Sequence, residues 1–267
     1  MLLQPRGPRI LIVDDLAIHR RLIAMRLGTQ VGEIAAVASA AEAEAFLADH
    51  HPALLLLDVV MPGKDGFALC AELKADPATQ DIAILMLTDL KGDAFQRSLD
   101  AGADDYLPKR VEDPVLRTRV HLHLQLQELR ARGGHRPYRQ TPASILLATP
   151  SPTLSAQLPA QFMADGHRTR LIESLAELPD ACLPGDRLVV LDTAMDPEGL
   201  AAALRRLRME PTTAGLPILL LCEKAELPVL TEVETMVDDI LWKPLNAKRT
   251  KHRLGFLLEL GGRTFGA

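Results

Sequence analysis

Four short apolar runs in the first half of the chain each lead directly into polar residues. The runs and the residues that follow them are 10–13 with Asp14 and Asp15, 54–57 with Asp58, 84–87 with Thr88, and 106–108 with Lys109. Short apolar runs separated by stretches of helical length are typical of parallel strands that are buried on both faces. The carboxyl ends of such strands meet at one edge of the sheet, where ligands bind. The sequence therefore predicts that three carboxylates, a hydroxyl and an ammonium converge there, as a divalent-metal and phosphoryl site requires.

The second half of the chain repeats this plan. Apolar runs of the same kind recur at 145–148, 188–191, 218–221 and 240–242. Asp58 precedes Thr88 by 30 residues, and Thr88 precedes Lys109 by 21 residues. The same two separations join Asp192 to Cys222 and Cys222 to Lys243. Equal separations at two successive steps predict a tandem duplication. Five strands alternating with five helices in each copy, joined by right-handed crossovers, predict a doubly wound α/β sandwich.

A linker is predicted between the two copies. Residues 132–142 are rich in Gly, Pro and Arg, a composition that breaks helices. An amphipathic stretch precedes it, with Pro114 suited to a first helical turn and Gly133 suited to a helix stop. We therefore predict one domain over residues 1–131, a linker over 132–143 and a second domain over 144–267.

Composition argues against membrane-spanning, secreted and disulfide-stabilised proteins. At 48% apolar and 24% charged residues, the chain of 267 residues has the composition of a soluble globular protein. No apolar stretch approaches the roughly 20 residues that span a bilayer, and the first residues lack the pattern of a signal peptide. The three cysteines have no close spacing, which argues against a disulfide framework or a zinc site. We expect a cytoplasmic protein that binds no membrane.

Charge is unevenly divided between the two copies. Residues 1–131 carry 14 Lys and Arg against 19 Asp and Glu, whereas the remaining residues carry 16 of each kind. Neither part is a basic platform, so we expect no nucleic-acid binding.

The first copy resembles the receiver domain of two-component response regulators over residues 8–131. The matching segments are Asp14-Asp15, Asp58-Val-Val-Met-Pro-Gly-Lys-Asp-Gly66, Thr88, and Ala101-Gly-Ala-Asp-Asp-Tyr-Leu-Pro-Lys109. The two copies together are similar to the front half of receiver–receiver–cyclase proteins that make cyclic di-GMP. The resemblance implies two flavodoxin-like (βα)5 domains and a signalling protein that is not itself an enzyme. It also implies that Asp58 accepts a phosphoryl group from a sensor histidine kinase or a phosphotransfer protein.

The matched residues have the chemistry for the roles that the resemblance implies. The Asp58 carboxylate would be the nucleophile that attacks phosphorus. Clustered carboxylates repel one another, and Mg²⁺ prefers oxygen ligands, so a Mg²⁺ ion would keep the cluster ionised. By resemblance its ligands are Asp15, Asp58 and the Val60 carbonyl, with Asp14 assisting through water. Lys109 would pair with a phosphoryl oxygen as a mobile point charge.

The resemblance also implies a conformational switch. Thr88 would donate a hydrogen bond to the phosphorylated form, and its movement would leave space into which Tyr106 rotates. The face formed by the fourth helix, fifth strand and fifth helix would then change shape. We expect the output to be a homodimer on phosphorylation, or binding of a downstream effector.

The second copy lacks several of these parts. Thr149 and Pro150 replace the acidic pair, and Cys222, a weak hydrogen-bond donor, replaces the threonine. Asp192 and Lys243 remain, and we expect a fixed ion pair between them. Lys243 is followed by Pro244, a step that the family often makes cis. We predict a degenerate receiver that serves as an adaptor for structure or dimer contacts.

Other residues of the first copy depart from the family or invite a second reading. Asp89 stands where the family usually has a small residue, which puts the lifetime of the phosphoryl group in question, and Arg110 stands where a proline is usual. His19 follows the acidic pair, and a solvent-facing position on the first helix is favoured over a metal ligand. His121 and His123 are expected at a surface or an interface.

Each matched residue taken alone has a purely structural alternative. Asp15 could cap a helix, Lys109 could be a solvated lysine, Thr88 a β-branched strand residue and Tyr106 a core side chain. Only their joint order and spacing favour the phosphoryl site.

Two other functions stay open. The chain could be the regulatory part of a diguanylate cyclase whose catalytic domain lies beyond residue 267. It could instead be a flavodoxin-like cofactor binder or hydrolase. The lack of a Gly-rich phosphate loop after the first strand argues against this function.

Overall fold

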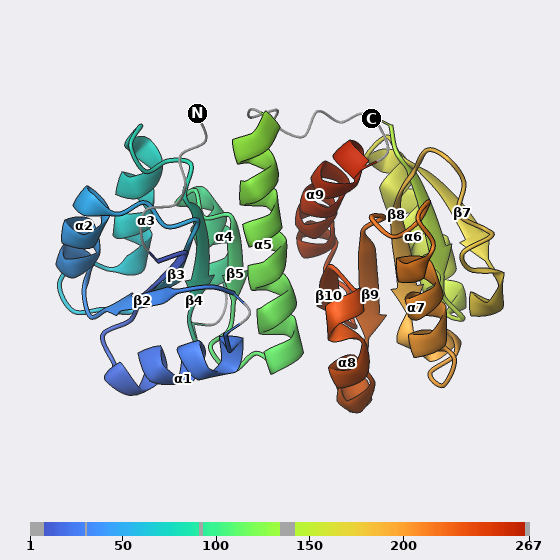
Figure 1. Cartoon of the computed structure of the whole chain (residues 1–267), viewed down its shortest axis with the longest axis horizontal. Coiled ribbons are helices and arrows are strands. Elements are labelled where there is room, and N and C mark those ends of the chain that lie inside the picture. Colours follow the sequence, from blue (N-terminus) through green and yellow to red (C-terminus); the bar gives the residue numbers. More distant parts are fainter. Residues whose placement is uncertain (1–7, 30, 91–92, 134–141, 265–267) are drawn as a thin grey trace. The chain divides into compact units, whose positions relative to one another are not determined.

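The computed structural model describes residues 8–29, 31–90, 93–133 and 142–264. It divides the chain into two compact units, Met1–Ala131 and Arg132–Ala267. Each unit holds one five-stranded sheet in which every neighbouring pair of strands is parallel. Figure 1 shows helices flanking each sheet. The predicted pair of doubly wound α/β folds is therefore confirmed.

The first unit contains five strands and five helices in alternation. The strands are β1 (Ile10–Val13), β2 (Ile34–Val37), β3 (Leu54–Asp58), β4 (Ala83–Leu87) and β5 (Asp105–Leu107), in the sheet order β2-β1-β3-β4-β5. The helices are α1 (Ala17–Leu27), α2 (Ala40–Asp49), α3 (Gly66–Ala75), α4 (Ala94–Asp100) and α5 (Asp113–Gly133). Strands β1 and β3 are neighbours in the sheet, but the strand that follows each of them lies on the opposite side, β2 beyond β1 and β4 beyond β3. The carboxyl ends of β1 and β3 therefore flank one crevice, where ligands bind in folds of this kind.

Every residue of β1, β3 and β4 is buried. This explains why these strands are continuous apolar runs rather than alternating ones. The segments after the strands are shaped by local chemistry. Asp65 caps α3, because its Oδ1 accepts the N–H of Ala68 at 2.8 Å. At Gly66 a Cβ atom would lie 2.2 Å from the Asp58 carbonyl oxygen, so only glycine lets α3 begin this close to the end of β3.

The second unit has the same topology with one crossover changed. Its strands are β6 (Ser144–Ala148), β7 (Arg168–Ile172), β8 (Asp186–Asp192), β9 (Ile218–Cys222) and β10 (Asp239–Trp242), in the sheet order β10-β9-β8-β6-β7. Its α-helices are α6 (Pro152–Ala164), α7 (Leu200–Met209), α8 (Leu227–Val233) and α9 (Ala247–Thr264).

Five helices were expected in the second unit, and that expectation is wrong at the second crossover. Between β7 and β8 the chain forms only a 3-10 turn, Leu175–Glu177. Ser174 and Glu177 form a capping box that starts the turn. Pro179 and Pro184 follow closely, and proline in a helix interior removes a hydrogen bond and clashes with the preceding turn. The capping signal is therefore not followed by an α-helix.

The two units also share a set of side-chain contacts. In each unit a basic side chain on the helix that follows the third strand binds two carbonyls and one carboxylate at corresponding positions, and in the second unit Arg208 Nε also donates to the Met236 carbonyl at 2.9 Å. The two sets are Lys74 with Gln80, Ile82 and Asp104, and Arg208 with Ala214, Leu216 and Asp238. Each member of the second set lies 134 residues after its counterpart. Shared contacts at a constant offset support the predicted duplication beyond the shared topology.

None of the helices in the described ranges combines the length and apolar composition that crossing a bilayer requires.

Candidate functional site

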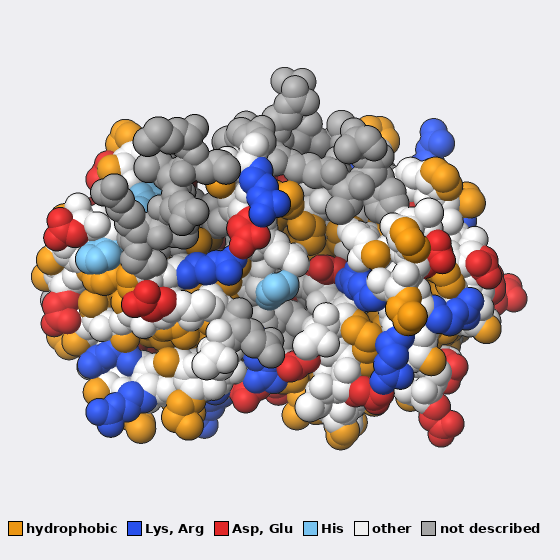
Figure 2. Space-filling view, viewed as in Figure 1, with side chains coloured by type: hydrophobic (Ala, Val, Ile, Leu, Met, Phe, Trp, Pro, Cys, Tyr) orange, Lys and Arg blue, Asp and Glu red, His pale blue; other side chains and the backbone are white. Residues whose placement is uncertain are grey.

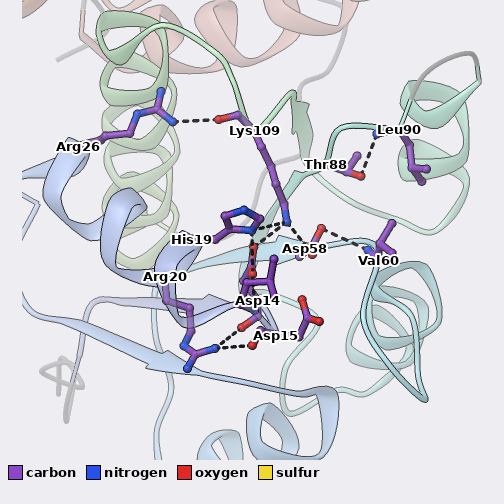
Figure 3. A network of polar contacts seen from close by, with 11 residues as sticks. Asp14, Asp15, His19, Arg20, Arg26, Asp58, Val60, Thr88, Leu90 and Lys109 are labelled. Atoms are coloured by element: carbon purple, nitrogen blue, oxygen red, sulfur yellow. Dashed lines mark hydrogen bonds and ion pairs between the residues drawn. The ribbon is translucent and has the colours of Figure 1, made fainter.

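Carboxylates and an ammonium meet at the carboxyl edge of the first sheet (Figure 3). Asp14 follows the last residue of β1 and is 1% exposed, and Asp58 ends β3 and is 3% exposed. Lys109 lies after β5, and its Nζ is 2.8 Å from Asp14 Oδ2 and 2.8 Å from Asp58 Oδ2. The structure thus brings together residues that are up to 95 positions apart in the sequence.

Burial shapes the titration of the two central groups. Burial raises the pKa of Asp58 above its usual value, although the hydrogen bond and charge of Lys109 oppose this, and the neighbouring Asp14 charge adds to the rise. Burial acts to lower the pKa of Lys109, but its hydrogen bonds to Asp14 and Asp58 outweigh burial and raise that pKa. Ionised Asp58 therefore depends on nearby positive charge.

The three carboxylates have the chemistry of a hard-cation site. Asp14, Asp15 and Asp58 each offer an oxygen, and these oxygens lie within 4.8 Å of one another. Oxygen ligands at such a spacing fit Mg²⁺, which keeps some of its waters. Val60 follows Asp58 on the same loop, and its N–H donates to Asp58 Oδ1 at 3.2 Å. The Asp58 carboxylate is thereby oriented with its other oxygen toward Lys109.

His19 corrects one expectation. Its side chain does not simply face solvent, because Nδ1 lies 3.2 Å from Asp14 Oδ1 and 3.2 Å from Lys109 Nζ. The physical reason is that α1 begins at Ala17, so His19 lies in the first turn. Helical side chains lean toward the N-terminus of their helix, which carries this ring back over Asp14.

The two histidines of α5 differ from each other. His121 is exposed, whereas His123 is 2% exposed with Nε2 3.6 Å from Asp105 Oδ2. A surface position is therefore wrong for His123. Residues two positions apart on a helix point to different faces, so the pair could not share one environment.

Two arginines of α1 contribute contacts that the sequence reasoning missed. Arg20 Nη1 donates to the carbonyls of Asp14 at 2.6 Å and Asp15 at 3.1 Å. Arg26 Nη1 donates to the carbonyl of Lys109 at 3.0 Å. Both contacts are drawn in Figure 3. The sequence feature that could have indicated these contacts is the pair of arginines, six positions apart, on the helix that follows the acidic pair.

The predicted switch residues are connected through Leu90. Thr88 is fully buried, and its Oγ1 accepts the N–H of Leu90 at 3.2 Å. The hydroxyl of Tyr106 donates to the Leu90 carbonyl at 3.0 Å, and its ring lies edge-on to Phe95 of α4, 6.4 Å between centroids. The Leu90 peptide groups thus bind both the threonine and the tyrosine.

The corresponding edge of the second unit is closed by its own side chains. Lys243 Nζ lies 2.8 Å from Asp192 Oδ1, which confirms the expected ion pair. The Thr149 hydroxyl donates to Asp192 Oδ2 at 2.8 Å, and the Lys243–Pro244 peptide is cis as expected. Burial raises the pKa of Cys222 far above the ordinary value for a thiol. Both oxygens of Asp192 have partners, so the carboxylate is satisfied within the protein.

Comparison with known proteins agrees with this geometry for the first unit. Residues 10–121 match the family model of the response regulator receiver domain. With its parallel sheet and acidic edge, this segment of the chain is similar to response regulator receiver domains.

Among the relatives, the chain is 32% identical to "Response regulator PleD" of Caulobacter vibrioides over 265 aligned positions, covering 92% of this chain and 58% of that protein. It is 42% identical over 105 positions to "Phosphate regulon transcriptional regulatory protein PhoB" of Pseudomonas aeruginosa, covering 39% of this chain and 45% of that protein. The chain thus spans about half the length of these relatives.

One solved structure is similar to part of the chain. The signal receiver domain of a signal transduction histidine kinase from Syntrophus aciditrophicus is 35% identical, with a TM-score of 0.42, and the match covers 44% of this chain and 90% of that one.

Proposed function

We propose that the protein accepts a phosphoryl group on Asp58 from the phosphohistidine of a sensor histidine kinase or phosphotransfer protein. The observation that carries this proposal is the contact of one lysine with two buried carboxylates, Lys109 Nζ at 2.8 Å from both Asp14 and Asp58. A buried carboxylate that is held ionised by an adjacent cation, at the open edge of a parallel sheet, is suited to nucleophilic attack.

The transfer divides into roles for the chain's own groups. A carboxylate oxygen of Asp58 forms a bond to phosphorus while the nitrogen–phosphorus bond of the phosphohistidine breaks and its electron pair returns to the imidazole. Asp14, Asp15, Asp58 and the Val60 carbonyl would hold Mg²⁺, which when bound neutralises charge on the phosphoryl oxygens. Lys109 pairs with a further phosphoryl oxygen through its mobile ammonium. Arg20 keeps the acidic loop in place through its carbonyls.

Helix α1 offers a docking surface for the donor protein. Ile18, Leu22 and Met25 are 67%, 49% and 78% exposed, and their spacing of four and three residues places them on one face of the helix. Figure 2 shows hydrophobic side chains at the surface of this part of the molecule. Because α1 also carries His19 to the acidic edge, a partner bound to this face would lie beside Asp58. An exposed apolar stripe is typical of a protein-interaction site.

The switch follows from competition for the Thr88 hydroxyl. When Thr88 turns to donate to a phosphoryl oxygen, it no longer accepts from the Leu90 N–H as it does at 3.2 Å. Leu90 is also the residue whose carbonyl binds Tyr106, so the loop and the tyrosine change together. The phosphoryl group then favours one of two existing arrangements, and the altered face binds a second copy or an effector.

For residues 144–267 we propose a degenerate receiver that acts as an adaptor. Asp192 is satisfied by Lys243 and Thr149, and the chain places no second or third carboxylate where the first unit has Asp14 and Asp15. Without those ligands a divalent cation has too few partners, and Asp192 stays in its ion pair.

The alternative of a cyclase regulatory part is favoured by one observation. The alignment with the PleD protein covers 92% of this chain but only 58% of that relative, which is therefore longer. A gene that continues past codon 267 into a cyclase domain supports this alternative, and a stop codon there contradicts it.

The test uses acetyl phosphate, Mg²⁺ and the full chain, with intact mass as the readout. Wild type and the Asp192→Asn variant should gain one phosphoryl group, and the Asp58→Asn variant should gain none. Retention of the label in Asp58→Asn, or its loss only in Asp192→Asn, would overturn the assignment. Light scattering with and without beryllofluoride, a phosphoryl mimic, then tests dimerisation, and an unchanged monomer contradicts it.

A further inference from the structure

One arginine of α1 holds the loop that carries Lys109 by three contacts. Arg26 Nη1 donates to the Lys109 carbonyl at 3.0 Å, Nη2 donates to the Val111 carbonyl, and Nε pairs with Asp113 Oδ1 at 2.6 Å. The Arg26 side chain is only 12% exposed, so its contacts with the two carbonyls are partly shielded from water, whereas its partner Asp113 is 49% exposed. The guanidinium fork therefore binds the whole segment between β5 and α5 rather than a single residue.

In the second unit the loop after the lysine is held in a different way. Gln161 of α6 occupies the position that corresponds to Arg26, 135 residues later, and its side-chain amide donates to the Ala247 carbonyl at 3.1 Å. The loop of that unit has Pro244 directly after its lysine, and the pyrrolidine ring restricts the backbone there. The first unit has Arg110 in that place. Its loop has a proline before the lysine, Pro108, but none after it, and the backbone after Lys109 is bound by the arginine instead.

The anchor matters because lysine is a flexible side chain. The ammonium of Lys109 reaches Asp14 and Asp58 through a four-carbon stem, and the position of that stem is set by the backbone that Arg26 binds. A displacement of a reacting group by about 1 Å can slow a reaction on the order of a hundredfold. Arg26 lies on the same helix as Arg20, which binds the acidic loop, so α1 sets the distance between the two sides of the site.

We propose that Arg26 is a positioning residue for phosphoryl acceptance, which fixes the backbone after Lys109, where the second unit has a proline after its lysine. The inference rests on the proposed function of Asp58. It predicts that Arg26 governs the rate of the transfer and leaves the affinity for Mg²⁺ unchanged, because the guanidinium contacts none of the three carboxylates that would hold the ion.

The experiment compares wild type with Arg26→Gln and Arg26→Lys in the full chain. The rate of labelling by acetyl phosphate is measured at saturating Mg²⁺, and the affinity for Mg²⁺ is measured separately by calorimetry. Arg26→Gln should slow labelling about tenfold or more, because the loop loses its hydrogen bonds to the guanidinium group. The affinity for Mg²⁺ should stay within about twofold of the wild-type value. Arg26→Lys should recover part of the rate, because an ammonium can still donate to the carbonyls.

Two controls isolate the effect. Arg9→Gln removes an ion pair with Glu128, which lies on α5 as Asp113 does but near the other end of the helix from Lys109. This variant should leave the rate of labelling unchanged. Asp113→Asn removes the charge that pairs with Arg26 and, at 3.8 Å, with Arg117, but it keeps the bonds of Arg26 to the two carbonyls. It should therefore slow labelling less than Arg26→Gln does. Asp113→Asn also serves if Arg26→Gln fails to fold.

The outcomes are distinguishable from failure of the proposed function. A labelled wild type with an equally fast Arg26→Gln overturns the inference alone. A parallel fall of the rate, the Mg²⁺ affinity and the free energy of unfolding also overturns it, because it means general support of the fold. A wild type that takes no label on Asp58 overturns the proposed function, and the inference with it.

Discussion

Replacing Lys109 by methionine should destabilise the protein strongly when no metal is bound. The substitution keeps the length of the side chain but removes the cation that lies 2.8 Å from both Asp14 and Asp58. Those carboxylates are 1% and 3% exposed, and each retains one backbone N–H partner, from Leu16 and Val60 respectively. Removing one partner of a buried ion pair typically costs about 3–5 kcal/mol, and we expect a loss in that range at neutral pH in EDTA.

The cost should depend on pH in a defined direction. Burial raises the pKa of Asp58, so as pH falls through that raised pKa the carboxyl takes up a proton and no longer needs a cation. The effect of Lys109→Met should therefore shrink on the acid side. Lys109 has a raised pKa, so its stabilising contribution is present throughout the neutral range and is lost only as pH rises through that value. Saturating Mg²⁺ should also reduce the cost, because ligand binding to the folded state replaces the missing charge.

The assay is urea denaturation of the full chain followed by circular dichroism, at neutral and acidic pH, with EDTA or Mg²⁺. The control is Lys64→Met, which removes pairs with Glu44 and Glu72 at 2.6 Å on the exposed surface and should leave the free energy of unfolding unchanged within error. A cost for Lys109→Met below about 1 kcal/mol in EDTA, the value of an exposed pair, would refute the reasoning. So would a cost that neither acid nor Mg²⁺ reduces.

Three further predictions concern the donor, the switch and the second unit. Ile18→Glu should slow transfer from a phosphohistidine protein while labelling by acetyl phosphate stays unchanged, and equal rates from the protein donor would contradict the docking surface. Tyr106→Phe removes the hydroxyl bonded to the Leu90 carbonyl, so it should preserve labelling but weaken phosphorylation-dependent dimerisation in light scattering; undiminished dimerisation would exclude this coupling. Asp192→Asn should lower the free energy of unfolding by about 3 kcal/mol, because it breaks the buried ion pair with Lys243. Unfolding is followed by the fluorescence of Trp242, the residue before Lys243, and an unshifted unfolding transition would mean that this ion pair contributes little.

Several features of the fold and site follow from the sequence itself. Runs such as 54–57 contain nothing but large apolar side chains, and short runs of this kind are typical of strands in a sheet that is covered on both faces. A residue that directly follows such a strand must lie at its carboxyl end, so the apolar pattern is sufficient to place Asp58 and Thr88 at one edge. The equal separations of the second half predict the second sheet by the same reasoning. Here local pattern is sufficient because strand direction and strand order are both tightly restricted.

The tertiary structure alone decided how the side chains at that edge are held. His19 turns back over Asp14, and Arg26 binds a loop 83 residues further along the chain, a contact that no periodicity in the sequence encodes. The second crossover of the second unit also differs from expectation, because Pro179 and Pro184 outweigh a capping signal. Local pattern determines which segments become strands and where they end. The direction of each long side chain depends on which partner lies within its reach, and only the packed chain supplies that partner.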